Sequence, residues 1–197
     1  MKIAHAWLFA LSCLVASAGC QRARVADGKS RDRLSIERLY PLRAGSVWTY
    51  DVDTGEGVPT LAITRVVSSA DKQAEVSSGG APIRYEQRAD GLYRADRAVY
   101  VLKLPLRVGA IWDAGQGATA EVTDLDKRVS TVAGEFSGCV EVRERSGEGQ
   151  KQVRTVFCPD VGPVEVESTL QLAITGRGAR VLAQLRGYDF SGALGSL

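Results

Sequence analysis

Cysteine and histidine are the residues of this 197-residue chain with the widest chemical repertoire, and the chain has four and one of them, respectively. His5 and Cys13 lie in residues 1–19, where one positive charge, a short apolar run and a small-residue end are typical of an export signal. Removal of this signal leaves the mature chain no imidazole for general-base catalysis or zinc binding. A G-x-S-x-G motif is also missing. The sequence therefore predicts no His-dependent catalytic site and no metal or cofactor site.

Cys20 closes the segment ASAGC and is a candidate for lipid attachment. The segment resembles the lipobox of bacterial lipoproteins, in which small residues precede an invariant cysteine that is diacylated before cleavage. Ser17 departs from the usual aliphatic residue, and A-S-A also fits ordinary signal peptidase, so simple secretion is the alternative. Lipidation leaves Cys139 and Cys158 as an even pair, whereas secretion leaves an odd thiol. We predict that residues 1–19 are a lipoprotein signal peptide and that Cys20 is acylated.

The segment after Cys20 bears on where the protein is anchored. Gln21, in place of aspartate, resembles the pattern of lipoproteins forwarded to the outer membrane, so we expect the periplasmic face of that membrane. Residues 20–38 are polar and charged, which predicts a flexible tether, with a short helical turn compatible with RLSIERLY. Two or more acyl chains give durable anchoring where one is marginal. The membrane is thus an expected partner through the N-terminal lipid.

Cys139 and Cys158 lie in two strand-like runs joined by the turn SGEGQ. A turn centred in this segment sets Cys139 opposite Cys158 and Val140 opposite Phe157. Facing Cβ atoms of antiparallel strands lie about 4.5–5.5 Å apart, near the range of a disulfide. An exported protein meets an oxidising compartment. We predict a structural disulfide, because the spacing is not the C-x-x-C of redox-active pairs.

Carboxylates offer weaker signals. The stretch DVDTGEG places Asp51 and Asp53 beside glycines, but the remaining ligands of a calcium loop are not at the required positions. We interpret this stretch as the end of a hairpin with solvated acids. A pair of acids suited to glycan hydrolysis remains an open but less favoured alternative, since none of the 23 acidic residues is singled out by the sequence.

The charge balance speaks against a nucleic-acid partner. One of the 25 basic residues, Lys2, leaves with the signal, so 24 basic and 23 acidic side chains remain, with no strongly basic cluster. Residues 39–197 are long enough for one domain with a hydrophobic core.

Short runs rich in valine, isoleucine, threonine and tyrosine alternate with turns marked by glycine, aspartate or proline. No helical period extends over twelve residues or more, so the sequence predicts an all-β domain: a curved antiparallel sheet, as an open barrel or a sandwich. The expected strands are 46–53, 60–69, 72–78, 82–88, 92–95, 98–103, 110–114, 118–125, 127–132, 137–145, 151–158, 163–174 and 179–189.

The phrase PLRAGSVW at residues 41–48 returns as PLRVGAIW at residues 105–112. We interpret the repeat as an internal duplication into two β-meander units of about 40–103 and 104–168, followed by a C-terminal hairpin at 169–190. Independent reuse of a good corner sequence is the alternative. Each copy combines a proline that fixes φ, a glycine that turns the chain and a tryptophan near the start of a strand: Pro41, Gly45 and Trp48, then Pro105, Gly109 and Trp112. We expect both indoles to pack in the core, the alternative being a ligand groove.

The segments YPLRAGSVWTYDV, LKLPLRVGAIW, TVAGEFSGCVEV and FCPDVGPVEVE follow one another between Tyr40 and Glu167. Their order is similar to that in uncharacterised bacterial lipoproteins with a P-L-x-x-G-x-x-W-x-Y opening, a V-x-A-G-x-F-x-x-C segment and a P-x-V-G strand entry. Cys158 departs from the usual aromatic residue of that pattern, which favours it as the partner of Cys139. The resemblance implies an envelope lipoprotein of β fold and implies no activity.

These observations predict a non-enzymatic, membrane-anchored periplasmic lipoprotein that acts as a binding or scaffold module for an envelope protein. The first alternative is a carrier of an apolar ligand such as a lipid. An apolar concave pocket of roughly 300–1,000 Å³ would favour the carrier, and a filled core with an exposed apolar patch would favour the scaffold.

Overall fold

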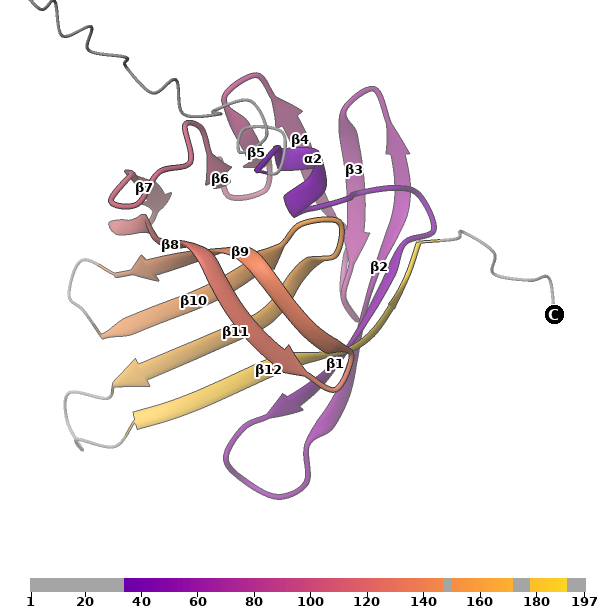
Figure 1. The fold of residues 1–197 in the computed structure, drawn as a ribbon, viewed down its shortest axis with the longest axis vertical. Helices are drawn as coiled ribbons and strands as arrows, with labels where there is room; N and C mark the ends of the chain where they lie inside the picture. The colour runs from indigo at the N-terminus through magenta and orange to yellow at the C-terminus, as the bar shows by residue number, and fades with distance from the viewer. Residues whose placement is uncertain (1–33, 147–149, 172–177, 191–197) are drawn as a thin grey trace, which may run out of the picture.

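Runs of β-branched and aromatic residues form the strands of this protein, and glycine- or aspartate-containing turns separate them (Figure 1). The structure is a computed structural model that describes residues 34–146, 150–171 and 178–190. These residues form the short helix α2 (Ile36–Leu39) and twelve strands. The strands are β1 (Val47–Asp53), β2 (Thr60–Ala70), β3 (Gln73–Ser77), β4 (Ile83–Arg88), β5 (Gly91–Arg94), β6 (Val99–Lys103), β7 (Ile111–Gly115), β8 (Ala118–Thr131), β9 (Gly134–Arg145), β10 (Lys151–Cys158), β11 (Gly162–Gln171) and β12 (Gly178–Asp189).

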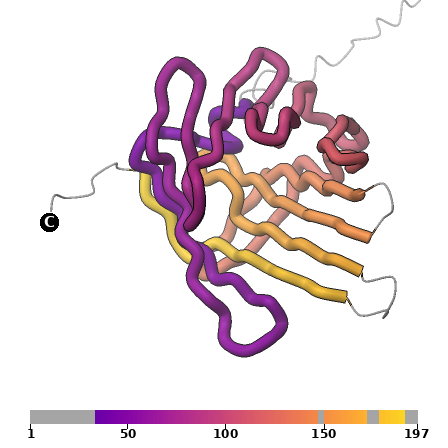
Figure 2. The backbone as a smooth tube through the Cα atoms, turned by 180° about the vertical axis from the view of Figure 1, so that it is seen from behind, coloured from indigo at the N-terminus to yellow at the C-terminus, as the bar shows by residue number. Residues whose placement is uncertain are grey.

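The twelve strands of the described residues belong to one antiparallel sheet in the order β6-β5-β4-β3-β2-β1-β12-β11-β10-β9-β8-β7. Two six-stranded meanders, β1–β6 and β7–β12, join where β1 pairs with β12. The sheet curls so strongly that β6 comes back into contact with β7, although no ladder of hydrogen bonds joins this pair (Figures 1 and 2). The result is a nearly closed, barrel-like sheet with one seam, between β6 and β7.

The predicted all-β class and curved antiparallel sheet are confirmed, and the expected strands correspond closely to those observed. The main difference is that the runs 118–125 and 127–132 form a single strand, β8. Its pairing with β9 shifts register around Asp124 and Lys127. A bulge bends a strand without ending it. The interruption of the alternating sequence pattern near residue 126 therefore marks a bend within β8, where the sequence predicted a turn between two strands.

The C-terminal hairpin is not an appendage to a second repeat unit ending near residue 168, which corrects the predicted unit boundaries. β12 pairs with β11 on one side and with β1 on the other, so it lies in the middle of the sheet. The second meander therefore runs from β7 to β12. The physical reason is that β1 needs a hydrogen-bonding neighbour on its outer edge, and β12 supplies it along its whole length.

The core gathers large side chains from both meanders into one cluster. Trp48 is fully buried at its centre, and the Tyr40 ring packs edge-on against it with ring centroids 5.6 Å apart. Tyr40 also contacts Tyr85 of the first meander and Phe157 of the second. Neither meander has a separate core, because the same aromatic cluster serves both.

Helix α2 overlaps the end of the predicted tether 20–38, and this part of that prediction is wrong. Ile36 and Leu39 are 5% and 0% exposed and belong to the core cluster, because their spacing of three positions puts them on one face of the helix. Arg38, on the same helix, pairs with Asp160 in the turn between β10 and β11. The folded domain thus includes Leu34 onward. Residues 20–33 lie outside the described residues.

Residues 125–138 of β8 and β9 form a two-stranded extension, called here the crossing ribbon. In Figure 1 it leaves the sheet and passes in front of β11 and β12. The amide of Ala133, in the ribbon's turn, donates a 3.3 Å hydrogen bond to the carbonyl of Leu185 on β12. Leu125, Val129 and Phe136 pack against the core cluster. The crossing ribbon therefore covers part of the core that the sheet alone leaves open.

Candidate functional site

The two copies of the repeated phrase fold into the same corner. Gly45 and Gly109 have φ angles of 83° and 79°, a region that favours glycine. Their amides donate to Val66 O on β2 and to Val122 O on β8, at 3.0 and 2.8 Å. The next bond of each corner is also equivalent, from Ser46 N to Arg43 O at 3.0 Å and from Ala110 N to Arg107 O at 2.9 Å. The repeated phrase thus encodes the same backbone corner at the start of each meander.

The tryptophans of these corners link the two meanders. The Trp48 indole on β1 donates a 2.7 Å hydrogen bond to the carbonyl of Val161, between β10 and β11. The Trp112 indole on β7 donates a 2.9 Å bond to the carbonyl of Tyr100 on β6. They are 0% and 6% exposed, which agrees with the predicted core packing and not with a ligand groove. These two predicted residues are anchors of the fold.

Cys139 and Cys158 form the predicted disulfide, with their Cα atoms 4.2 Å apart and both residues buried. The register of β9 and β10 is the one expected, with Val140 opposite Phe157. β10 ends at Cys158, while β9 extends past Cys139 into the crossing ribbon. The bridge therefore fastens the point at which the ribbon leaves the sheet. The third cysteine of the expected mature chain, Cys20, lies outside the described residues.

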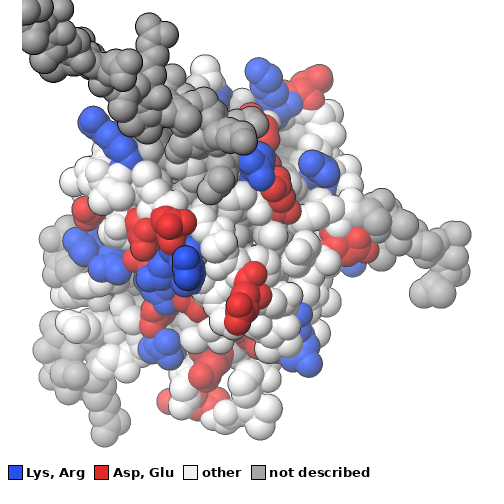
Figure 3. All heavy atoms as spheres, in the orientation of Figure 1, with Lys and Arg blue, Asp and Glu red and all other residues white. Residues whose placement is uncertain are grey.

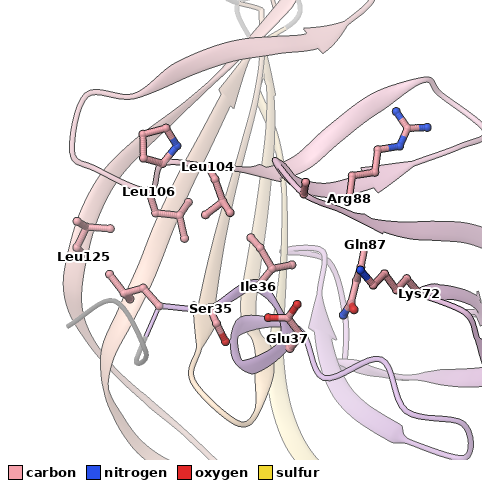
Figure 4. A pocket seen from close by; sticks show the side chains of 12 residues that line it. Ser35, Ile36, Glu37, Lys72, Gln87, Arg88, Leu104, Leu106 and Leu125 are labelled. Atoms are coloured by element: carbon pink, nitrogen blue, oxygen red, sulfur yellow. The ribbon is translucent and has the colours of Figure 1, made fainter. Parts of the chain in front are cut away.

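A pocket of about 680 Å³ opens beside α2, at the end of the barrel-like sheet where the β6–β7 connection passes (Figure 4). We call it the mouth pocket. Its apolar lining comes from α2 and the residues before it, from the connection between β6 and β7, and from the bend of β8. These side chains are Leu34, Ile36, Leu104, Pro105, Leu106 and Leu125. Because they arise from three distant parts of the chain, only the closed fold brings them together.

The other side of the mouth pocket is polar. Lys72 in the turn between β2 and β3, and Gln87 and Arg88 on β4, lie across from the leucines in Figure 4, while Glu37 of α2 lies between the two groups. The Arg88 guanidinium binds Glu86 through bonds of 3.1 and 2.7 Å and stacks on the Tyr93 ring at 3.3 Å. The pocket is therefore amphipathic, with an apolar half and a charged half.

A second set of polar groups, the charged ladder, crosses β8 to β12 on the sheet face opposite Val140 and Val142. Glu141 is 3% exposed and receives Lys127 at 2.9 Å and Arg143 at 2.9 Å. Arg154 bridges Glu165 at 2.6 Å and Glu167 at 2.7 Å, and Arg180 binds Glu167 from the far side. Every carboxylate of the ladder is thus matched by a cation.

The ladder's electrostatics suit structure better than acid catalysis. Burial opposes ionisation of Glu141, but the hydrogen bonds from Lys127 and Thr123 outweigh it and hold its pKa below the ordinary range. Hydrogen bonds from Arg180 and Arg154 likewise lower the pKa of Glu167. A general acid needs a raised pKa to keep its proton near neutral pH. These carboxylates are held ionised by their partners instead.

The mouth pocket has a limited chemical inventory. Glu37 is the only carboxylate among the described residues that line it, so this part of the lining holds one acid where glycan hydrolysis uses two. Within the described ranges, no group of three or more histidine, cysteine, aspartate or glutamate residues is placed to hold a metal ion. No helix in the described part of the chain is long and apolar enough to cross a bilayer.

Basic and acidic side chains are mixed on the face shown in Figure 3, where the blue group left of centre lies directly against red atoms. Asp51, which the sequence placed near a weak calcium-like stretch, instead receives Arg186 of β12 at 2.8 Å. Asp53 Oδ1 accepts the amide of Gly55 at 2.7 Å in the following turn. Both acids serve the β1–β2 hairpin and its neighbour.

Sequence reasoning missed the mouth pocket. A signal for half of it was present: Ile36, Leu39 and Tyr40 have the spacing of a helix face, and the segment LPL at 104–106 is an apolar run outside any strand. What the sequence did not show is that these segments meet Leu125, since that contact depends on closure of the sheet.

No protein-family model matches this chain, and no curated protein matches it. Among solved structures, the chain is similar to a crystal structure of a "putative lipoprotein" from Parabacteroides distasonis. The two share 12% sequence identity with a TM-score of 0.45, over 77% of this chain and 98% of that chain. At this identity and TM-score, the likeness assigns no function to the chain.

Proposed function

We propose that this protein is a lipid-anchored envelope protein that binds an apolar ligand in the mouth pocket without transforming it. The observation that carries this proposal is the mouth pocket itself: about 680 Å³, with leucine, isoleucine and proline side chains on one side. Small-molecule sites typically measure about 300–1,000 Å³ and are mainly apolar with a few polar groups. Each methylene of a ligand that leaves water here contributes about 0.8 kcal/mol.

The position of the pocket supports a role close to a membrane. The pocket begins at Leu34, directly after the segment that we expect to tether the domain to an acylated Cys20. At about 3.3–3.6 Å per residue, the chain from Cys20 to Leu34 spans at most roughly 50 Å. The mouth pocket therefore stays within that distance of the bilayer, which suits a ligand drawn from it. Gln21 favours the periplasmic face of the outer membrane.

A binding role fits the residues better than a catalytic one. The expected mature chain has no histidine, and the described residues that line the mouth pocket include one carboxylate and no cysteine. General acid–base catalysis needs a group of suitable pKa within reach of the ligand, usually with a second group to complete the proton transfer. Glu37 is exposed, and no second carboxylate stands beside it among the described residues that line the pocket.

Docking of an envelope protein is the second candidate function. It is favoured by a row of exposed apolar side chains on the outer face of β2: Leu61 at 59%, Ile63 at 48% and Val67 at 54%. The alternation of strand residues puts Leu61 and Ile63 on one face, and Val67 is exposed at the bulge that follows on the same strand. Surface apolar residues in a row mark interaction sites more often than isolated ones do.

Native mass spectrometry of the full-length protein extracted from cell envelopes tests the proposed function. We expect a covalent lipid on Cys20 and, in addition, a bound amphiphile that dissociates on collisional activation. An unmodified N-terminus ahead of Cys20 would remove the anchor, and protein free of any small molecule that also fails to bind added fatty acid would remove the ligand site.

A pair of leucine variants localises the ligand. Leu104 lines the mouth pocket and is 39% exposed, while Leu61 on β2 is 59% exposed and outside the pocket. Leu104→Gln should weaken binding of a fluorescent fatty acid by about ten-fold, since one leucine contact is worth about 1.5 kcal/mol. Leu61→Gln should leave it unchanged. Equal losses in both variants would place the ligand elsewhere, and loss of a cross-linked partner in Leu61→Gln alone would support docking.

A further inference from the structure

We infer that the ligand of the mouth pocket is an amphiphile with a zwitterionic head group, a phospholipid carrying a phosphate and a primary amine. This inference rests on the proposed function, and it adds the chemistry of the head group. The observation behind it is the placement of two opposite charges, Lys72 and Glu37, at the rim of a pocket whose other half is apolar.

The two halves of the pocket are separated in space. Figure 4 shows Leu104, Leu106, Leu125 and Ile36 gathered on one side, with the polar Lys72–Gln87–Arg88 group across from them. A purely apolar ligand would leave the polar half without a use, and a small polar ligand would leave the leucines exposed. An amphiphile fills both, because its chain lies among the leucines and its head reaches the rim.

The charges at the rim are not all available. The charge of Arg88 is balanced by Glu86, whose carboxylate lies 2.7 Å from its guanidinium. Lys72 and Glu37 are both exposed, and neither forms an ion pair with any described residue. Among the residues that the structure describes, the rim therefore offers an ammonium and a carboxylate without an ion-pair partner.

Charge complementarity then selects the head group. A phosphate is attracted to Lys72 and also finds the amide of Gln87 as a hydrogen-bond donor. An amine is attracted to Glu37. A head group with net negative charge satisfies Lys72 but lies near the carboxylate of Glu37, and an uncharged head gains from neither. Like-charge proximity disfavours the anionic ligand.

Binding is measured by displacement of a fluorescent fatty acid from the mature chain carrying Cys20→Ser, which stays free of lipid and detergent. Three competitors share one acyl chain: lysophosphatidylethanolamine, lysophosphatidylglycerol and monoacylglycerol. We expect the ethanolamine lipid to bind about two- to five-fold more tightly than the other two, the range of exposed ion pairs.

Two rim variants assign the charges. Glu37→Gln should remove the preference for lysophosphatidylethanolamine over lysophosphatidylglycerol. Lys72→Gln should weaken binding of both phospholipids and leave binding of monoacylglycerol unchanged. Glu56→Gln and Lys151→Gln, at exposed positions outside the pocket lining, are the matched controls and should change nothing.

The outcomes separate the two proposals. Equal binding of all three lipids, insensitive to the rim variants, overturns the head-group inference and leaves the proposed function standing. Tighter binding of lysophosphatidylglycerol than of lysophosphatidylethanolamine also overturns the head-group inference, in favour of an anionic ligand. Failure of every competitor and of the fatty acid itself overturns the proposed function.

Discussion

The indole nitrogens of Trp48 and Trp112 each donate to a carbonyl in the meander to which the tryptophan does not belong. Trp48 reaches Val161 in the second meander, and Trp112 reaches Tyr100 in the first. A buried carbonyl without a donor costs about 1–3 kcal/mol. These two bonds therefore act on the relative placement of the meanders, in addition to the apolar area that the indoles bury.

Replacement of either tryptophan by phenylalanine keeps a ring and removes the donor. We expect Trp48→Phe to lower the free energy of unfolding by about 2–3 kcal/mol, because the Val161 carbonyl is then buried and unpaired. Trp112→Phe should cost about 1 kcal/mol less, since its bond to Tyr100 is only partly buried. Urea unfolding of the expected mature chain, which lacks Trp7, measures both, and the remaining tryptophan supplies the fluorescence in each variant. Equal costs would contradict the distinction.

Residue-level predictions from sequence succeeded where the partners are close along the chain. Cys139 and Cys158 are separated by 19 positions and joined by one turn, so hairpin geometry alone could pair them. The partners of Trp48 lie 113 positions away at Val161, and no local rule points to that carbonyl. For the same reason, no local pattern could predict that Leu125 and Ile36 line one pocket.

Among the elements, the crossing ribbon has a covalent bond at its base, the disulfide between Cys139 and Cys158. It leaves the sheet at Cys139, beyond the end of β10, and is held at its far end by the hydrogen bond from Ala133 to Leu185. Register shifts along β8 supply the bend. The disulfide and the Ala133 hydrogen bond thus hold the two ends of the crossing ribbon.

Removal of the disulfide should loosen the crossing ribbon before it unfolds the sheet. We expect Cys139→Ala with Cys158→Ala to lower the free energy of unfolding by about 3 kcal/mol, the chain-entropy value for a loop of about 20 residues. The amide of Ala133 should exchange with solvent faster, while amides in the centre of β1 and β12 keep their protection relative to global stability. Hydrogen exchange measures this, and uniform acceleration along the chain would contradict a local effect.

At the scale of the whole fold, the described residues form two six-stranded meanders that join at β1–β12 and have no ladder of hydrogen bonds at the β6–β7 seam. The corners at Gly45 and Gly109 are equivalent, yet their neighbours differ, because β1 has a partner on each side and β7 has one. The open seam adjoins the β6–β7 connection that carries Leu104 and Leu106. The mouth pocket is thus lined in part by the connection that passes this seam.

A shared core predicts that the meanders unfold together. Tyr40, Trp48, Phe157 and Leu185 belong to one buried cluster that neither meander could complete alone. Scanning calorimetry should show a single transition whose calorimetric and van't Hoff enthalpies agree. Two resolved transitions would mean that each meander has an independent core.

The amino-acid sequence by itself determined the strand class, most strand positions, the hairpin register of the disulfide and the two tryptophan corners, because alternation, turn residues and hairpin pairing are local. It did not determine that β12 lies between β1 and β11, that α2 belongs to the core, or that the leucines at 34, 104, 106 and 125 share a pocket. Those features depend on how a curved sheet closes. Closure is decided by contacts between residues far apart in the chain, whose entropy cost and packing gain no local pattern records.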